Sequence, residues 1–269
     1  MKPRLEHILE VLEEIAPGRL AETWDNPGLQ VGGRDHPVGR ILISLDPTLE
    51  AVQEASRIKA DLLVTHHPLI FKPLSSIQPD RYPGDVLYEA VLHRIAVASA
   101  HTNLDAARGG VNDLLAGLLG LKEIEVLDVR DDPCSGEGIG RLGLLSAPIP
   151  LSDLVVHAKR VFGTPTVGVV GRAERIISSA AVVGGSGGGL VAIAAKKGAD
   201  VLITGDIGHH DALNALSHGL AVIDAGHFHT EKAAMSGFRD AVKTCLESAG
   251  YGAIEVDVFR GESPPMRHQ

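Results

Sequence analysis

Residues 61–68 of the chain read DLLVTHHP, a short apolar run that ends in two adjacent histidines and a proline. Residues 61–65 have the length and character of a buried strand. Pro68 disfavours helical backbone at His67 and removes a ladder donor, so the strand ends there. Because successive strand side chains leave on opposite faces, His66 and His67 reach one site only where the backbone becomes irregular. Taken alone, the doublet is more readily two surface histidines than a metal site.

Strand and helix patterns alternate along the rest of the chain, which indicates an α/β fold with parallel sheets covered on both faces. Strands are predicted at 40–46, 61–65, 166–170, 176–183, 199–206 and 253–259, and at the start of the segments 96–110 and 220–231. Helices are predicted at 4–16, 47–58, 83–95, 111–120, 152–161, 190–198 and 208–219. A last, long helix is predicted after the segment 220–231 and ends at about Ser248. In such sheets, ligands bind at the carboxyl ends of the strands.

Two pairs of segments repeat weakly between the halves of the chain. KADLLVTHH resembles KGADVLITGD, and HRIAVASAHTNLD resembles HGLAVIDAGHFHTE. We interpret them as two similar α/β lobes with largely parallel sheets facing a central cleft, either from a duplication or from chance convergence of βα units. We expect a first lobe at 1–125, with 251–269 returning to it, and a second at 126–250. Two short strands within 123–150, separated by the polar segment 130–138, are interpreted as a hinge or domain junction.

Composition excludes several classes of protein. The chain has 269 residues, and its 25 Lys and Arg against 34 Asp and Glu give a net charge of −9. This balance disfavours nucleic-acid binding, although a ring with a basic inner surface would evade the argument. Cys134 and Cys245 are isolated, so neither a disulfide framework nor a thiolate site is expected. The charged start resembles no signal peptide and no apolar run reaches membrane length, so we expect a cytoplasmic protein without a membrane partner.

Histidines and acids at strand ends form a candidate metal centre. The ligand candidates are His66, His67, Asp105, His227 and Glu231. His227 and Glu231 are four residues apart at a helix start, so they share one face. Five such ligands exceed the needs of one tetrahedral ion and favour two ions about 3.5–4 Å apart, with Asp105 as the bridge. Nitrogen and oxygen donors suit Zn, Mn, Fe, Co or Ni. Singly, each residue has a structural alternative, such as a helix cap, a solvated first-turn acid or a turn residue.

Further residues are candidates for substrate contact. The run GGSGGG (184–189), with Gly185, Ser186 and Gly187, is either a flexible loop or an anion cradle at a helix start. The loop TWDNPGLQVGG is either a structural turn or the frame of a pocket. His101 and His229 are the imidazoles near the ligands that are able to carry a proton. The other candidates are Trp24, Asp25 and Asn26 in that loop, and Asp206, His209 and His210, which line the pocket or form a solvated helix start.

In their order along the chain, TWDNPGLQVG, LISLDPT, LLVTHHPLIF, AHTNLDAARGGVNDLLA, GGSGGG, LITGD and DAGHFHTE resemble the Nif-three-like family, whose bacterial members are labelled GTP cyclohydrolase 1 type 2 homologues. The resemblance implies two similar α/β lobes, a dinuclear metal centre and a toroidal homohexamer. It implies the same five ligands, and it leaves His229 at a position not expected to bind metal. The span 123–174 is too short for the domain that longer relatives insert, so the chain is the compact form.

Two functions follow from this reading. The first is a dinuclear-metal-dependent hydrolase, in which activated water opens the guanine imidazole ring of GTP and releases formate. His101 would carry the proton, the glycine run would hold the triphosphate and Trp24 would stack on the base. The alternative is a metal-binding, metal-delivery or regulatory protein without hydrolase activity, because a shared fold does not fix a substrate.

Overall fold

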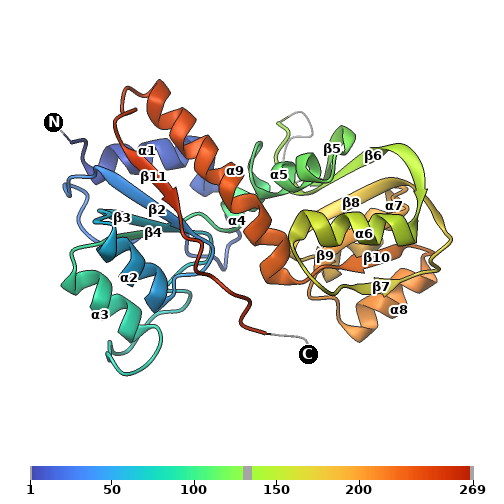
Figure 1. The fold of residues 1–269 in the computed structure, drawn as a ribbon, viewed down its shortest axis with the longest axis horizontal. Coiled ribbons are helices and arrows are strands. Elements are labelled where there is room, and N and C mark those ends of the chain that lie inside the picture. The colour runs from blue at the N-terminus through green and yellow to red at the C-terminus, as the bar shows by residue number, and fades with distance from the viewer. Residues whose placement is uncertain (1, 130–134, 267–269) are drawn as a thin grey trace. The chain divides into compact units, whose positions relative to one another are not determined.

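The computed structural model describes residues 2–129 and 135–266 and confirms a mixed α/β fold with two sheets (Figure 1). Two compact units divide the chain: unit 1 is Met1–Ala107 with Met235–Ser263, and unit 2 is Arg108–Ala234 with Pro264–Gln269. The first change of unit falls between Ala107 and Arg108, and the lobes expected at 1–125 with 251–269 and at 126–250 stay a prediction. Helix α9 (His227–Ser248) begins in unit 2 and continues in unit 1. Cys134 lies outside the described residues.

Unit 1 contains a five-stranded sheet in the order β1-β4-β3-β2-β11. Strands β2, β3, β4 and β11 run parallel to their neighbours, and β1 is antiparallel to β4. The last strand, β11, lies beside β2 (Figure 1). The strands are β1 (Gly28–Val31), β2 (Arg40–Ser44), β3 (Leu62–Thr65), β4 (Ala96–Ser99) and β11 (Glu255–Val258).

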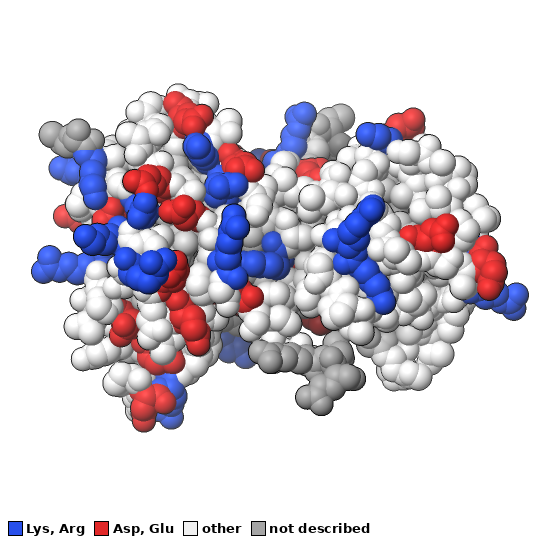
Figure 2. Space-filling view, viewed as in Figure 1, with Lys and Arg blue, Asp and Glu red and all other residues white. Residues whose placement is uncertain are grey.

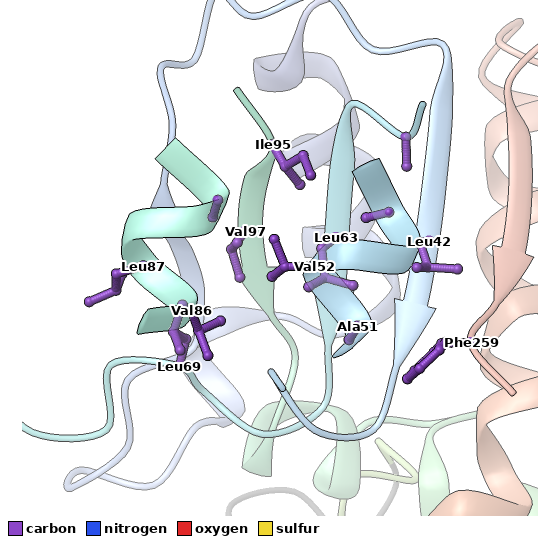
Figure 3. Close-up of a cluster of buried hydrophobic side chains, with 13 residues drawn as sticks. Leu42, Ala51, Val52, Leu63, Leu69, Val86, Leu87, Ile95, Val97 and Phe259 are labelled. Carbon is purple, nitrogen blue, oxygen red and sulfur yellow. The ribbon is translucent and has the colours of Figure 1, made fainter. Parts of the chain in front are cut away.

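The core of unit 1 follows from strand alternation. Leu42, Leu63 and Val97 point to one face of the sheet, where they pack with buried residues of α2 and α3 (Figure 3). The alternate residues, such as Ile41 and Val64, are equally buried, so both faces of the sheet are covered. The helices of this unit, besides its part of α9, are α1 (Leu5–Ile15), η1 (Gly18–Leu20), α2 (Leu49–Arg57), α3 (Gly84–Leu92) and α4 (Thr102–Ala106).

Unit 2 contains a six-stranded sheet in the order β5-β6-β8-β9-β10-β7. Only β8, β9 and β10 are parallel to one another, and the other pairings are antiparallel. The expectation of a largely parallel sheet therefore holds for unit 1 alone. The strands are β5 (Lys122–Val129), β6 (Gly138–Pro150), β7 (Gly168–Val170), β8 (Ile176–Ser186), β9 (Val201–Gly205) and β10 (Ala221–Asp224). The helices are α5 (Val111–Leu118), α6 (Leu151–Phe162), η2 (Gly188–Leu190), α7 (Val191–Lys196) and α8 (His209–Ser217).

The interpretation of residues 123–150 as a hinge or junction is wrong. β5 and β6 pair with each other, and β6 pairs with β8, so the segment forms one edge of the unit 2 sheet. Arg141 on β6 is buried, and its guanidinium binds the Asp113 carboxylate at 2.6 Å (Nε–Oδ1) and two backbone carbonyls. Residues 130–134 of the polar segment that suggested a linker lie outside the described residues.

The weak sequence repeat corresponds to a structural repeat, with β2-α2-β3-α3-β4 in unit 1 and β8-α7-β9-α8-β10 in unit 2. Asp61 precedes β3 and accepts hydrogen bonds from the Gly39 and Arg40 amides at the start of β2. Asp200 precedes β9 and accepts from the amides of Ser178 and Ser179 in β8. The same capping contact at equivalent positions favours duplication over chance convergence.

The surface agrees with the charge balance of the sequence. On the face drawn in Figure 2, basic and acidic side chains are interspersed over unit 1. Among the described residues, no helix is both long and apolar enough to span a membrane.

Candidate metal centre

Three neighbouring parallel strands of unit 1 direct the candidate ligands to one edge of the sheet. β2 ends before Asp46, β3 ends before the His66–His67 doublet, and β4 ends before His101. The carboxyl ends of parallel neighbours lie side by side, so residues remote in sequence meet there. This edge is the position at which α/β sheets commonly bind ligands.

The backbone of the His66–His67 doublet remains hydrogen-bonded to the neighbouring chain after β3 ends. The amides of His66 and His67 donate to the carbonyls of Ser44 and Leu45, and the Thr65 hydroxyl donates to the His67 carbonyl at 2.7 Å. The chain bends after Thr65, and the two imidazole centroids lie 5.1 Å apart. Both rings therefore reach one site through the irregular backbone that the sequence required.

His101 and Asp105 are placed by the short helix α4, which the sequence did not predict. Asn103 fixes it, because its Oδ1 accepts from the His101 amide at 2.8 Å and its Nδ2 donates to the Ala16 carbonyl at 2.6 Å. His101 caps the start of the helix, and Asp105 lies one turn later. Asp105 Oδ1 is 3.6 Å from Nε2 of the fully buried His66.

The donor atoms of His66, His67 and His101 all lie within 4.8 Å of one another, a separation that suits a shared metal ion. Sequence reasoning gave His101 only a proton-carrying role. Its ring centroid is 5.2 Å from that of His66 and 5.5 Å from that of His67, so it belongs to the same cluster.

Each imidazole of the cluster is oriented through its Nδ1 atom. His66 Nδ1 lies 2.8 Å from the Ala100 carbonyl, His67 Nδ1 lies 2.7 Å from Asp46 Oδ1, and His101 Nδ1 lies 2.7 Å from Asp25 Oδ1. Acceptors at Nδ1 select the tautomer that carries its proton there and leaves the Nε2 lone pair for a metal. We assign the tautomers from this hydrogen-bond network.

The carboxylate beneath His101 is strongly held. Burial works against ionisation of Asp25, but hydrogen bonds from His101 and Thr102, with the charge of His101, outweigh it and lower its pKa to about 2. Asp25 was a candidate for substrate contact. Its two oxygens instead accept from the His101 ring and from the Thr102 amide and hydroxyl, so its observed role is to orient His101.

Unit 2 presents a second group of candidate ligands at the carboxyl ends of β9 and β10. His227 and Glu231 occupy the first turns of α9, with His227 Nε2 3.1 Å from Glu231 Oε2. His227 Nδ1 lies 2.7 Å from Asp206 Oδ2, which repeats the arrangement of unit 1. Asp206 follows β9 with a left-handed φ of 54°. A candidate for substrate contact thus again orients a histidine.

The glycine run is not the free loop expected between strand and helix, because β8 continues through Gly184 and Gly185 to Ser186. A Cβ atom on Gly185 would lie 2.2 Å from Glu231 Oε1 and 3.2 Å from His227 Nε2. At Gly188, a Cβ atom would lie 2.6 Å from Asp211 Oδ2. The missing side chains therefore leave space for the carboxylates of Glu231 and Asp211.

The remaining candidates lie at the margins. His209 and His210 are exposed at the start of α8, as in the solvated alternative. His229 points away from the face shared by His227 and Glu231, and its imidazole contacts the Phe162 backbone; burial lowers its pKa more than that hydrogen bond raises it. Asn26 donates from Nδ2 to the Ile70 carbonyl at 2.6 Å and so joins two loops of unit 1.

Sequence reasoning missed two contributors, Asp46 and Glu262. Glu262, beyond β11, accepts at Oε1 from the Ser44 hydroxyl and from the Leu45 and Asp46 amides, at 2.7–2.8 Å. It thereby fixes the backbone that carries the Asp46 carboxylate to His67. The motif LISLDPT contained Asp46, but no local signal connects Glu262 with residues more than two hundred positions earlier.

Comparison with known proteins shows that nearly the whole chain is similar to one protein family. Residues 3–265 match the family Duf34/NIF3 (NGG1p interacting factor 3). A Clostridium perfringens protein named GTP cyclohydrolase 1 type 2 homolog is 35% identical over 245 residues, covering 91% of this chain and 93% of that protein.

Solved structures give the same result. Staphylococcus aureus hypothetical protein SA1388 is 30% identical with a TM-score of 0.94, and the alignment covers 100% of both chains. A Bacillus cereus protein related to NIF3 is 26% identical with a TM-score of 0.93, covering 100% of this chain and 99% of that one. These similarities extend over both units.

Proposed function

The chain belongs to the Duf34/NIF3 family, and from that premise we propose that it is a dinuclear-metal-dependent hydrolase. In this proposal His66, His67 and Asp105 of unit 1 act with His227 and Glu231 of unit 2 to hold two divalent ions, with Asp105 as the bridge. The name of the Clostridium perfringens relative directs the proposal to GTP, whose guanine imidazole ring would be opened with release of formate.

One observation supports metal binding above all others. Each histidine of the candidate centre, in both units, has Nδ1 hydrogen-bonded to a carboxylate or a backbone carbonyl. Histidine ligands of metals are typically oriented in this way by an acceptor at the nitrogen that does not bind the metal. The donor set of imidazoles and carboxylates, without thiolate, suits Zn, Mn, Fe, Co or Ni.

Two such ions, when bound, lower the pKa of a water molecule and polarise the carbon to be attacked. Ring opening at C8 of guanine and release of that carbon as formate together consume two water molecules per GTP. The protein must therefore move protons as well as hold the ions.

His101 is the residue proposed to move a proton. Its ring is within the cluster but partly exposed, and its Nδ1 lies 2.7 Å from Oδ1 of the buried Asp25 carboxylate. This pairing of an imidazole with an orienting carboxylate is a common form of general acid–base group. Because its donor atom also lies within reach of the other imidazoles, a ligand role for His101 competes with proton transfer.

The test measures metal content and formate together. The protein is stripped with chelator, reloaded separately with Zn, Mn, Fe, Co or Ni, and supplied with GTP, and formate is quantified for wild type, Asp105→Ala and Glu231→Ala. We expect formate release that falls at least 100-fold in both variants. Glu247→Ala, an exposed acid on the same helix as Glu231, is the control and should retain the wild-type rate.

Equal formate release by wild type and both variants would overturn the hydrolase proposal. Stoichiometric metal binding without formate release from GTP would instead favour the alternative of a metal-binding, metal-delivery or regulatory protein.

A further inference from the structure

Two aromatic side chains of unit 1 are exposed next to each other although the protein has few aromatic residues. Trp24 is 56% exposed and Phe71 is 46% exposed, and their ring centroids lie 5.8 Å apart at an interplanar angle of 60°. Trp, Tyr and Phe make up only 3% of the chain. Large adjacent aromatic surfaces left in water commonly mark a binding site.

Both rings are carried by loops that polar contacts hold in place. On one side, the Asp25 carboxylate accepts from the Thr102 amide and hydroxyl. On the other side, the Ile70 carbonyl accepts from Asn26 Nδ2, and the Ile70 amide donates to Gln30 Oε1 at 2.7 Å. The residues adjoining Trp24 and Phe71 are thus fixed while the two rings remain accessible. Rigid positioning of an exposed ring lowers the entropic cost of binding to it.

The aromatic pair lies beside the histidine cluster. The His101 centroid is 6.0 Å from that of Trp24 and 6.4 Å from that of Phe71, with interplanar angles of 72° and 75°. A flat molecule placed on the pair therefore has an edge close to the imidazole that we propose as the proton carrier.

We propose that Trp24 and Phe71 form a stacking platform that binds a planar heteroaromatic ring of the substrate. The inference rests on the proposed function for its position beside the metal centre, and it deepens that function by adding Phe71 and by defining the recognised group as the ring. Stacking accepts any flat π-system, so the platform selects the chemical class, whereas polar groups around it select among rings.

Trp24 is the single tryptophan, so its fluorescence reports directly on the platform. Zinc-loaded protein is titrated with guanosine and with nicotinamide, and in parallel with ribose 5-phosphate and tripolyphosphate, which lack an aromatic ring. We expect saturable quenching by guanosine or nicotinamide and none by the other two compounds. Absence of quenching by both ring compounds, or equal quenching by ribose 5-phosphate, would overturn the proposal.

Phe71→Ala tests the second half of the platform. One base–aromatic stack contributes about 1–3 kcal/mol, so the apparent Kd for the ring should rise about 5- to 150-fold. Tyr88→Ala, which removes an exposed aromatic residue on α3, is the matched control and should leave the Kd unchanged. An unchanged Kd in Phe71→Ala contradicts the platform. Because this readout needs no turnover, ring binding without formate release would reject the hydrolase and leave the platform intact.

Discussion

Single hydrogen bonds decide which nitrogen of each histidine faces the candidate centre. In His67, Asp46 at Nδ1 leaves the Nε2 lone pair toward the neighbouring imidazoles, and the Ala100 carbonyl does the same for His66. These acceptors orient rings that would otherwise sample several rotamers and two tautomers.

Replacing Asp46 tests this orientation directly. Asp46→Ala removes the acceptor of His67, and loss of such an outer partner typically lowers metal affinity 10- to 100-fold. Titration of the chelator-treated protein with zinc measures the affinity. Glu50→Ala is the control, because Glu50 lines the same 190 Å³ cavity as Asp46 but is exposed. A Kd equal to wild type in Asp46→Ala would show that His67 needs no orienting carboxylate.

The carboxylate of Asp25 makes the free energy of unfolding of the metal-free protein depend on pH. Its folded pKa of about 2 lies below the ordinary 3.8, so its stabilising contribution is complete above about pH 4 and disappears as the pH falls through about 2. Asp25→Asn should therefore lower the free energy of unfolding by about 1–2 kcal/mol at pH 7, and the difference should vanish near pH 2. Urea unfolding at several pH values measures this. A difference that stays constant with pH would contradict the assigned pKa.

The glycine run 184–189 begins in β8, and its lack of side chains leaves space for the candidate ligands Glu231 and His227. Gly185 has φ +65° and lies against Glu231 and His227, whereas Gly189 has nothing within 4 Å of a Cβ atom. The same run thus contains a constrained glycine and an unconstrained one.

Gly185→Ala should displace Glu231 and reduce zinc affinity at least 10-fold, and backbone strain should lower stability by roughly 1–3 kcal/mol. Gly189→Ala should change neither quantity by much, because its Cβ enters open space. Calorimetric zinc titration and thermal unfolding of both variants provide the comparison. Similar losses in the two variants would show that the run acts only through its general flexibility.

The segment after β11 contributes Glu262, which holds the backbone at Asp46 and thereby supports the candidate metal centre. Glu262→Ala leaves the Leu45 and Asp46 amides without their carboxylate acceptor, at a cost of about 1–3 kcal/mol, and should weaken zinc binding through Asp46 and His67. Glu262→Gln keeps a side-chain carbonyl in place and should restore most of the affinity. The imidazole nitrogen NMR shifts of His67 distinguish altered orientation from general destabilisation. Unchanged shifts and affinity in Glu262→Ala would refute the connection.

At the level of the whole molecule, candidate ligands or the acids that orient them follow β2, β3 and β4 in unit 1 and β9 and β10 in unit 2. If the ions take ligands from both units, binding stabilises the entire chain. Zinc at about 100 times its Kd contributes about 2.7 kcal/mol, which corresponds to a Tm increase of roughly 5–10 °C.

Asp105→Ala in unit 1 and His227→Ala in unit 2 should each abolish most of that increase, whereas Glu247→Ala should preserve it. Differential scanning calorimetry with zinc and with chelator measures the shift. A full shift in either ligand variant would show that the unit concerned supplies no ligand. Native mass spectrometry of the same samples tests the hexamer that the family resemblance implies.

The sequence by itself determined most of the strands and helices and the histidine–carboxylate candidates, whereas β1 lies in a stretch that the sequence indicated as a loop. Hydrophobic periodicity is a local property, and so are the HHP doublet and the i, i+4 spacing of His227 and Glu231. The repeat was also legible, because both copies keep an aspartate before the middle strand.

The tertiary structure alone decided how those candidates are supported. Asp25 meets His101 across 76 positions and Glu262 meets Asp46 across 216, and Trp24 meets Phe71 through two separate loops. The structure also shows that β5 and β6, within 123–150, belong to a sheet and are not a junction. It shows that Gly185 has no side chain where Glu231 and His227 lie against it. Such contacts depend on loop paths and strand order, which are set by the packing of the whole unit and leave no periodic signal in the residues themselves.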